Sequence, residues 1–156
     1  MIEDGDKPEP RTRADHSHTL VKALQAVPSL GICDERTLLE IVGDSVNLVW
    51  PAGHKVFEPG TPSSGLFIVL SGRVRVLRDG GDELAELGPG EHFGELSLLL
   101  GTMHQHAVEA LEDTELMVVP KERFDALVGD NPRLAGEIRR KAEERMAMNR
   151  GDAPTD

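Results

Sequence analysis

The sequence predicts an α+β fold in which a small antiparallel β-roll lies between helices at both ends of the chain. Apolar residues recur at helical spacing near both ends of the 156 residues. Between them, short apolar runs rich in β-branched residues alternate with turn signals about every 8 to 12 residues. Aromatic residues make up only 3% of the chain, so the core must be aliphatic. The length suits one domain of ordinary size.

The N-terminal part predicts a tail followed by two helices. Residues 1–14 are charged and contain proline, so we expect a mobile tail. Asp15 is a suitable N-cap for a first helix, which Pro28 ends, and Asp34 is a suitable N-cap for a second. The apolar positions of the two helices are Leu20, Val21, Leu24 and Val27, and then Leu38, Leu39, Ile41 and Val42.

The segment from about residue 46 to 119 predicts the strands of the roll. Residues 66–70 form a continuous apolar run, which is typical of a buried strand. Residues 73–78 alternate apolar and basic side chains, which indicates a strand with one solvated face, and Gly80-Gly81 would return it through residues 83–87. Residues 107–111 and 115–119 predict a further strand pair. The pattern favours a roll of the jelly-roll type.

The chain closes with two predicted helices over about residues 120–148, followed by a tail at 149–156. Pro120 suits a first helical position, and Phe124, Leu127 and Val128 share one face. Asn131-Pro132 opens a longer helix with an apolar stripe. That stripe either packs on the roll or pairs with a second copy as a homodimer. Its members are Leu134, Ile138, Ala142 and Met146.

The bulk charge restricts the partners. The chain has 17 Lys and Arg against 28 Asp and Glu, a net charge of −11. This disfavours nucleic acid polymers and anionic membrane surfaces, and any anionic ligand would need local donors. The polar N-terminus resembles no signal peptide, and no apolar run approaches the ~20 residues of a membrane span, so we expect a cytoplasmic protein. The single cysteine, Cys33, is expected to be a buried apolar residue without a disulfide.

The segment 89–101 carries the chemistry. A strand should end at Phe93, Gly94 allows close backbone approach, and residues 95–100 have the composition of a short helix. The N-terminus of a helix attracts anions. Glu95 would repel a phosphate there, unless it accepts a hydrogen bond from a hydroxyl beside that phosphate. Taken alone, the segment fits a plain capped connecting helix better than a ligand site.

The run from Pro51 to Met146 resembles the cyclic nucleotide-binding domain family, the β-roll that senses cAMP or cGMP. The resemblance rests on residues 51–60, 65–74, 87–99 and 110–115. It covers well over half the chain and implies an eight-stranded antiparallel β-roll, N-terminal entry helices, a hinge helix and a lid helix over about residues 132–148.

The resemblance also implies a ligand site, cAMP or cGMP being the candidate ligand and no other cofactor being expected. Glu95 would accept the ribose 2′-hydroxyl, and backbone N–H groups would line the site. The arginine that pairs with the cyclic phosphate in the family falls at His104, which has one useful N–H and an ordinary pKa near 6.5. The ligand-binding residues would be Phe93, Gly94, Glu95, Leu96, Ser97, His104, Gln105 and His106.

His104 leaves three interpretations open. The site could have lost its ligand, leaving a structural or protein-interaction module. A cyclic nucleotide could still bind through backbone amides and a protonated His104 or His106, weakly or more tightly at low pH. A different ligand could bind, and Gln105, where many members have a small residue, fits an altered preference.

A metal site and an enzyme are not expected. His104 and His106 would share one face of a strand, but the glutamate that a cupin metal site needs would fall at Ala110 or Leu111, and His16 and His18 have no nearby partner in sequence. No nucleophile elbow, P-loop or GxGxxG motif is present. We therefore expect a stand-alone regulatory sensor domain that acts on an unidentified protein partner, because the ten residues after Met146 are too few for a helix-turn-helix domain.

Overall fold

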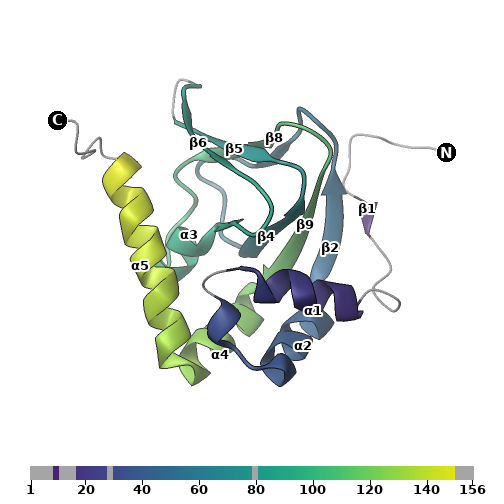
Figure 1. Cartoon of the computed structure of the whole chain (residues 1–156). Coiled ribbons are helices and arrows are strands. Elements are labelled where there is room, and N and C mark those ends of the chain that lie inside the picture. The colour runs from purple at the N-terminus through teal and green to yellow at the C-terminus, as the bar shows by residue number, and fades with distance from the viewer. Residues whose placement is uncertain (1–8, 11–16, 28–29, 79–80, 150–156) are drawn as a thin grey trace.

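Two antiparallel sheets form a roll that helices close at one end and along one side (Figure 1). The computed structural model describes residues 9–10, 17–27, 30–78 and 81–149. The first sheet contains, in spatial order, β1 (Glu9–Pro10), β2 (Val46–Trp50), β9 (Thr114–Pro120), β4 (Gly65–Ser71) and β7 (His92–Phe93). The second contains β3 (Lys55–Phe57), β8 (Ala107–Ala110), β5 (Val74–Leu77) and β6 (Glu83–Leu87). Within the described residues, β2 to β9 are the eight strands of the predicted roll, which confirms the fold class.

The predicted pairing of residues 107–111 with 115–119 is wrong. β8 pairs with β3 and β5 in the second sheet, whereas β9 pairs with β2 and β4 in the first. The chain changes sheets at a corner where Thr114 Oγ1 lies 3.2 Å from the donating Arg73 N and 3.0 Å from the Arg73 carbonyl oxygen. A Cβ on Gly72 would lie 2.5 Å from Thr114 Oγ1, so only glycine fits there. The same corner separates β4 from β5, so the resembling segment 65–74 also spans two sheets.

The predicted hairpin of β5 and β6 is present, and part of the predicted N-terminal tail pairs with a strand. β5 and β6 pair antiparallel as predicted, and their turn is closed by Arg78 N donating to the Asp82 carbonyl oxygen at 2.8 Å. Of the predicted tail 1–14, the structure describes only Glu9 and Pro10, which pair with β2.

The structure describes five α-helices and one 3₁₀ turn in the covered residues. α1 spans Ser17–Gln25, α2 Glu35–Asp44, α3 Glu95–Leu100, α4 Lys121–Asp130 and α5 Pro132–Asn149, with a 3₁₀ turn, η1, at Leu30–Ile32. Asp34 caps α2 as predicted, its Oδ1 accepting from Thr37 N at 2.9 Å. Pro120 was expected at the first helical position but is the N-cap of α4, because β9 continues through it with extended backbone. Asp15 and Pro28 lie outside the described residues.

Two apolar clusters hold the molecule together. One fills the roll, and the other joins the first sheet to α1, α2, α4 and α5; Cys33 is half-buried against the second. Leu134 and Ile138 of α5 are 0% and 1% exposed, so the described half of the predicted stripe packs within the molecule. The side chains of Ala142 and Met146 lie outside the described part.

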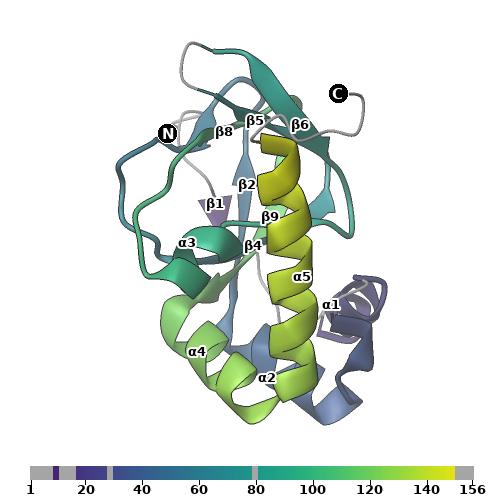
Figure 2. The same cartoon turned by 90° about the vertical axis from the view of Figure 1, so that its left-hand side faces the viewer.

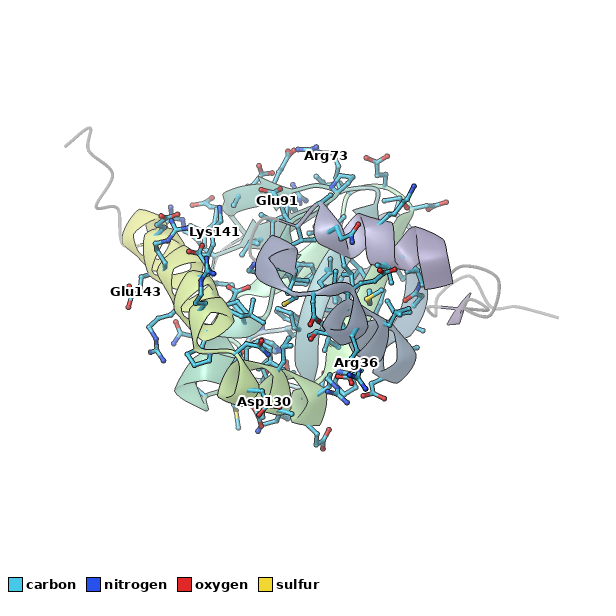
Figure 3. The ribbon with its side chains drawn as sticks, turned by 60° about the horizontal axis from the view of Figure 1, so that its bottom comes forward. Arg36, Arg73, Glu91, Asp130, Lys141 and Glu143 are labelled. Carbon is cyan, nitrogen blue, oxygen red and sulfur yellow. The ribbon has the colours of Figure 1, made fainter. Side chains whose placement is uncertain are left out.

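The C-terminal helix runs past α3 and the side of the roll, as two views show (Figures 1 and 2). Figure 3 shows Lys141 on the side of α5 turned toward the roll and Glu143 on the opposite side. Lys141 is half-buried and Glu143 is exposed, which agrees with this orientation. Among the described residues, no helix has the length and apolar character that crossing a bilayer requires.

Candidate functional site

The link from β7 to α3 depends on a glycine. Gly94 has φ 88°, and a Cβ there would lie 3.1 Å from both the Gly65 carbonyl oxygen and Phe67 Cδ1. Another residue would be strained in this conformation and crowded by β4. α3 ends after six residues at Gly101, whose N–H donates to the Ser97 carbonyl oxygen. The strand end at Phe93 and the short helix over 95–100 are therefore as the sequence predicted.

A cavity lies between α3, the segment that follows it, and strands of the second sheet. The lining residues enclose a small inner cavity of about 70 Å³. Seven of the eight predicted site residues line it. Leu96 belongs to α3, but its side chain lies outside the described part. The lining residues are Phe57, Val76, Phe93, Gly94, Glu95, Ser97, Thr102, Met103, His104, Gln105, His106 and Val108.

Three of the residues that the sequence did not indicate come from β3, β5 and β8. Phe57, Val76 and Val108 form an apolar wall. Val76 and Val108 are register partners in neighbouring strands, so they point to the same face of the second sheet. The alternation of residues 73–78 indicated an inward-facing Val76. It could not indicate that this face meets α3, because that contact joins segments distant in sequence.

His104 is fixed by the loop between β3 and β4. Gly60 N donates to the His104 carbonyl oxygen at 2.8 Å, and His104 N donates to the Thr61 carbonyl oxygen at 3.0 Å. The imidazole stacks on the ring of Phe57, with centroids 3.6 Å apart and an interplanar angle of 2°. The residue is only 6% exposed. Contacts with the roll therefore hold His104 in position.

The side chain of His104 is also hydrogen-bonded to α3. Its Nδ1 lies 3.0 Å from Ser97 Oγ, and Ser97 Oγ lies 3.3 Å from the Gly94 carbonyl oxygen. Both contacts are satisfied when the imidazole Nδ1–H donates to Ser97 and the Ser97 hydroxyl donates to Gly94. Burial lowers the pKa of His104 from 6.5, because desolvation penalises the imidazolium. At pH 7 His104 is therefore neutral and offers no positive charge.

Glu95 is a buried carboxylate with a histidine partner. It is 1% exposed, and the Nδ1–H of His92 donates to its Oε1 at 2.9 Å. His92 is also buried. It lies beside Glu95 because the chain turns from β7 into α3 at Gly94. The sequence analysis missed His92, although its three-residue spacing from Glu95 across a glycine was a signal. The hydrogen bond fixes the orientation of the carboxylate.

The cavity lining contains no lysine or arginine among the described residues. The arginines of the second sheet are paired elsewhere. Arg73 Nη2 lies 2.9 Å from Glu86 Oε1, and Arg75 Nη2 lies 3.0 Å from Glu109 Oε1. Arg73 projects at the surface of the molecule (Figure 3). Glu95 is thus the one residue among the described lining that is an Asp, Glu, Lys or Arg.

The histidines do not form a metal-binding group in the described residues. His104 is buried with its Nδ1 bonded to Ser97, and His106 is half-buried in the same lining. No group of three or more histidine, cysteine, aspartate or glutamate side chains with a metal-binding arrangement occurs in the part of the chain that the structure describes. His16 lies outside this part, as does the side chain of His18.

Comparisons with known proteins agree on one family. Residues 48–131 match the model of the cyclic nucleotide-binding domain. The cyclic AMP receptor protein of Thermus thermophilus is 40% identical over 94 residues, 58% of this chain and 44% of that protein. The lysophospholipase NTE1 of Chaetomium globosum is 36% identical over 99 residues, 61% of this chain and 6% of that protein. The chain therefore spans less than half the length of either relative.

Solved structures show the same fold. The regulatory subunit of a cAMP-independent protein kinase A from Trypanosoma brucei has a TM-score of 0.75. The match covers 83% of this chain and 48% of that chain at 22% identity. At this level of identity, the likeness is one of fold.

Proposed function

The chain belongs to the cyclic nucleotide-binding domain family, and on that premise we propose that it is a regulatory module that binds a cyclic nucleotide weakly beside α3. The observation that carries the proposal is the convergence of seven expected ligand-binding residues on one cavity, whose described lining contains no lysine or arginine. The role is regulatory, with no catalytic step of its own, and the output passes to a protein partner or a second copy.

Glu95, His104 and the backbone of α3 each have a role in this proposal. Glu95, whose orientation is held by His92, accepts a ribose hydroxyl. The backbone N–H groups near Gly94 and Ser97 donate hydrogen bonds to the cyclic phosphate. His104 occupies the place of the phosphate-pairing arginine but is neutral. Loss of a desolvated ion pair costs about 2–5 kcal/mol, or roughly 30- to 4,000-fold in affinity. Binding should therefore be weak at neutral pH.

A second candidate is a module that keeps the fold for protein contacts and binds no ligand. The observation that favours it is the set of contacts that His104 already makes. Its ring stacks on Phe57 and its Nδ1 bonds to Ser97, so the side chain spans the site without a ligand. The inner cavity of about 70 Å³ is also far smaller than the roughly 300 Å³ or more of ordinary ligand pockets.

Calorimetric titration of the full chain with cAMP and cGMP at about pH 6 and pH 7.5 separates the two candidates. Weak binding supports the regulatory site, and no heat up to about 1 mM ligand supports the ligand-free module. The variant His104→Arg should bind at least about tenfold more tightly, because a fixed charge returns to the site.

The matched control is Gln25→Arg. Gln25 is exposed at the end of α1, outside the cavity, and the substitution changes the net charge by the same amount. It should leave the affinity as in the wild type. Equal affinities for wild type and His104→Arg would mean that His104 does not lie at the phosphate position.

A further inference from the structure

A chain of hydrogen bonds determines which nitrogen of His104 carries the proton. The Nδ1–H of His104 donates to Ser97 Oγ at 3.0 Å, and the Ser97 hydroxyl donates to the Gly94 carbonyl oxygen at 3.3 Å. In the opposite tautomer the Ser97 hydroxyl would have to donate to Nδ1, and the Gly94 carbonyl oxygen would lose this donor. The hydrogen bonds therefore favour an imidazole with a proton on Nδ1 and a lone pair on Nε2.

The Nε2 atom of His104 is the ring nitrogen that remains for a ligand. His104 lines the cavity, and its Nε2 makes no hydrogen bond within the part of the chain that the structure describes. Stacking on Phe57 at a centroid distance of 3.6 Å keeps the ring in this orientation. A bare Nε2 can only accept a hydrogen bond, and so can a phosphate oxygen. The two atoms can therefore share a hydrogen bond only after Nε2 has gained a proton.

Other titratable side chains on the surrounding elements lack this arrangement. They are Glu95 on α3, His92 on β7, Lys55 and Glu58 at β3, Arg75 on β5, His106 before β8, and Glu109 on β8. Glu95 is hydrogen-bonded to His92 at 2.9 Å. The ion pairs of Lys55 with Glu58 and of Arg75 with Glu109 lie outside the lining. His104 stands where the resemblance places the phosphate-pairing side chain, so it is the group expected to take up the proton.

We propose that His104 takes up a proton when a cyclic nucleotide binds, and that Ser97 imposes this coupling by holding Nε2 as an acceptor. The proton comes from water and adds to Nε2, which then donates to a phosphate oxygen. The inference rests on the proposed function, since it concerns the regulation of the same site. The module then responds to its ligand and to acidity together.

Burial and the ligand act on the pKa of His104 in opposite directions. Burial lowers this pKa from 6.5 in the free protein, whereas a phosphate in contact with Nε2 favours the imidazolium and raises the pKa in the complex. Proton and ligand therefore strengthen each other's binding by the same factor. Between the two pKa values, the affinity should rise by up to about tenfold for each pH unit of acidification.

Calorimetry of the full chain with cAMP measures the proton uptake when it is done in two buffers of different ionisation enthalpy, such as PIPES and ACES. At about pH 6.5 the wild type should take up a measurable fraction of a proton per ligand, and at about pH 8 none. Its affinity should be at least about tenfold higher at about pH 6 than at about pH 8.

Three variants locate the coupling. His104→Gln should bind without proton uptake and with the same affinity at both pH values. The matched control is His54→Gln, which removes a histidine between β2 and β3, outside the cavity, and should keep the wild-type uptake. Ser97→Ala lets either ring nitrogen carry the proton of a neutral imidazole, so its proton uptake and its pH dependence should both decrease. A purely structural role of Ser97 would instead lower the affinity equally at both pH values.

The outcomes separate this inference from the proposed function. Binding of cAMP by the wild type without proton uptake at about pH 6.5 overturns the inference and leaves the proposed function standing. That measurement needs no variant, so it holds even if a substitution prevents folding, which thermal unfolding detects. Uptake that persists in His104→Gln, or is unchanged in Ser97→Ala, also overturns the inference. Absence of binding at every pH overturns both.

Discussion

At the scale of single residues, His104 is the position that most distinguishes this chain from the pattern that it resembles. His104 and Glu95 line the same cavity, and their spacing in the sequence is a local signal. The sequence could not predict the protonation state of His104. That state depends on burial, and part of the burial comes from the ring of Phe57, which belongs to the distant strand β3. A protonated His104 was one of the alternatives that the sequence left open, and burial makes it less favourable because it lowers the pKa of His104.

The lowered pKa makes the stability of the protein depend on pH. The folded pKa of His104 lies below the unfolded value of 6.5, so the unfolded chain binds more protons as the pH falls below that value. The contribution of His104 is fully present above about pH 6.5 and is lost on acidification, at no more than about 1.4 kcal/mol per pH unit.

Urea unfolding at about pH 7.5 and pH 5.5 tests this prediction. On acidification, the free energy of unfolding of the wild type should decrease more than that of His104→Gln, because glutamine at position 104 does not titrate. The comparison cancels the other histidines and the carboxylates. Identical decreases in the two proteins would show that His104 is solvated in the folded state.

At the scale of elements, the sequence predicted the type and order of most helices and strands but not which strands pair. The alternation of 73–78 and the apolar run of 66–70 are local signals, and both appear as strands. The sheet to which β8 and β9 belong is decided by the corner at Gly72 and Thr114, which lie 42 positions apart in the chain. A pattern of period two cannot indicate such a crossing.

A single substitution can test how α5 packs on the rest of the molecule. Ile138 is 1% exposed in the cluster that joins α5 to the first sheet, and α5 also contacts α3. Ile138→Ala should reduce the free energy of unfolding by about 2–5 kcal/mol, because it leaves a cavity in a packed core. Since α3 carries Glu95 and Ser97, ligand affinity should fall as well.

Arg139→Ala provides the control for Ile138→Ala. Arg139 is the next residue on α5 and is exposed, and the change to alanine costs no helix propensity. Urea unfolding and calorimetry should find this variant close to the wild type in both stability and affinity. If Ile138→Ala unfolds like Arg139→Ala, α5 does not pack on the first sheet in solution.

At the scale of the whole molecule, the net charge of −11 acts on every anion that approaches the cavity. The field of the protein is screened by salt, with a Debye length of about 30 Å at 0.01 M and about 8 Å at 0.15 M. Without a cation in the described lining, the repulsion is not offset locally. The affinity for cAMP should therefore increase between about 10 mM and 150 mM NaCl.

Parallel titrations at the two salt concentrations measure this effect. A decrease of cAMP affinity with added salt would contradict it, because such a decrease indicates an attractive charge at the site. Gln25→Arg alters the net charge but not the cavity. Its affinity for cAMP should also increase with added salt, as in the wild type.

The most direct test of the site is a crystal structure of the protein with cAMP at saturating concentration. The account predicts ligand density in the cavity between Gly94–Ser97 and His104, with ribose hydroxyls within hydrogen-bond distance of the Glu95 carboxylate. An empty cavity, or a phosphate held by His104 with the ribose turned away from Glu95, would contradict it.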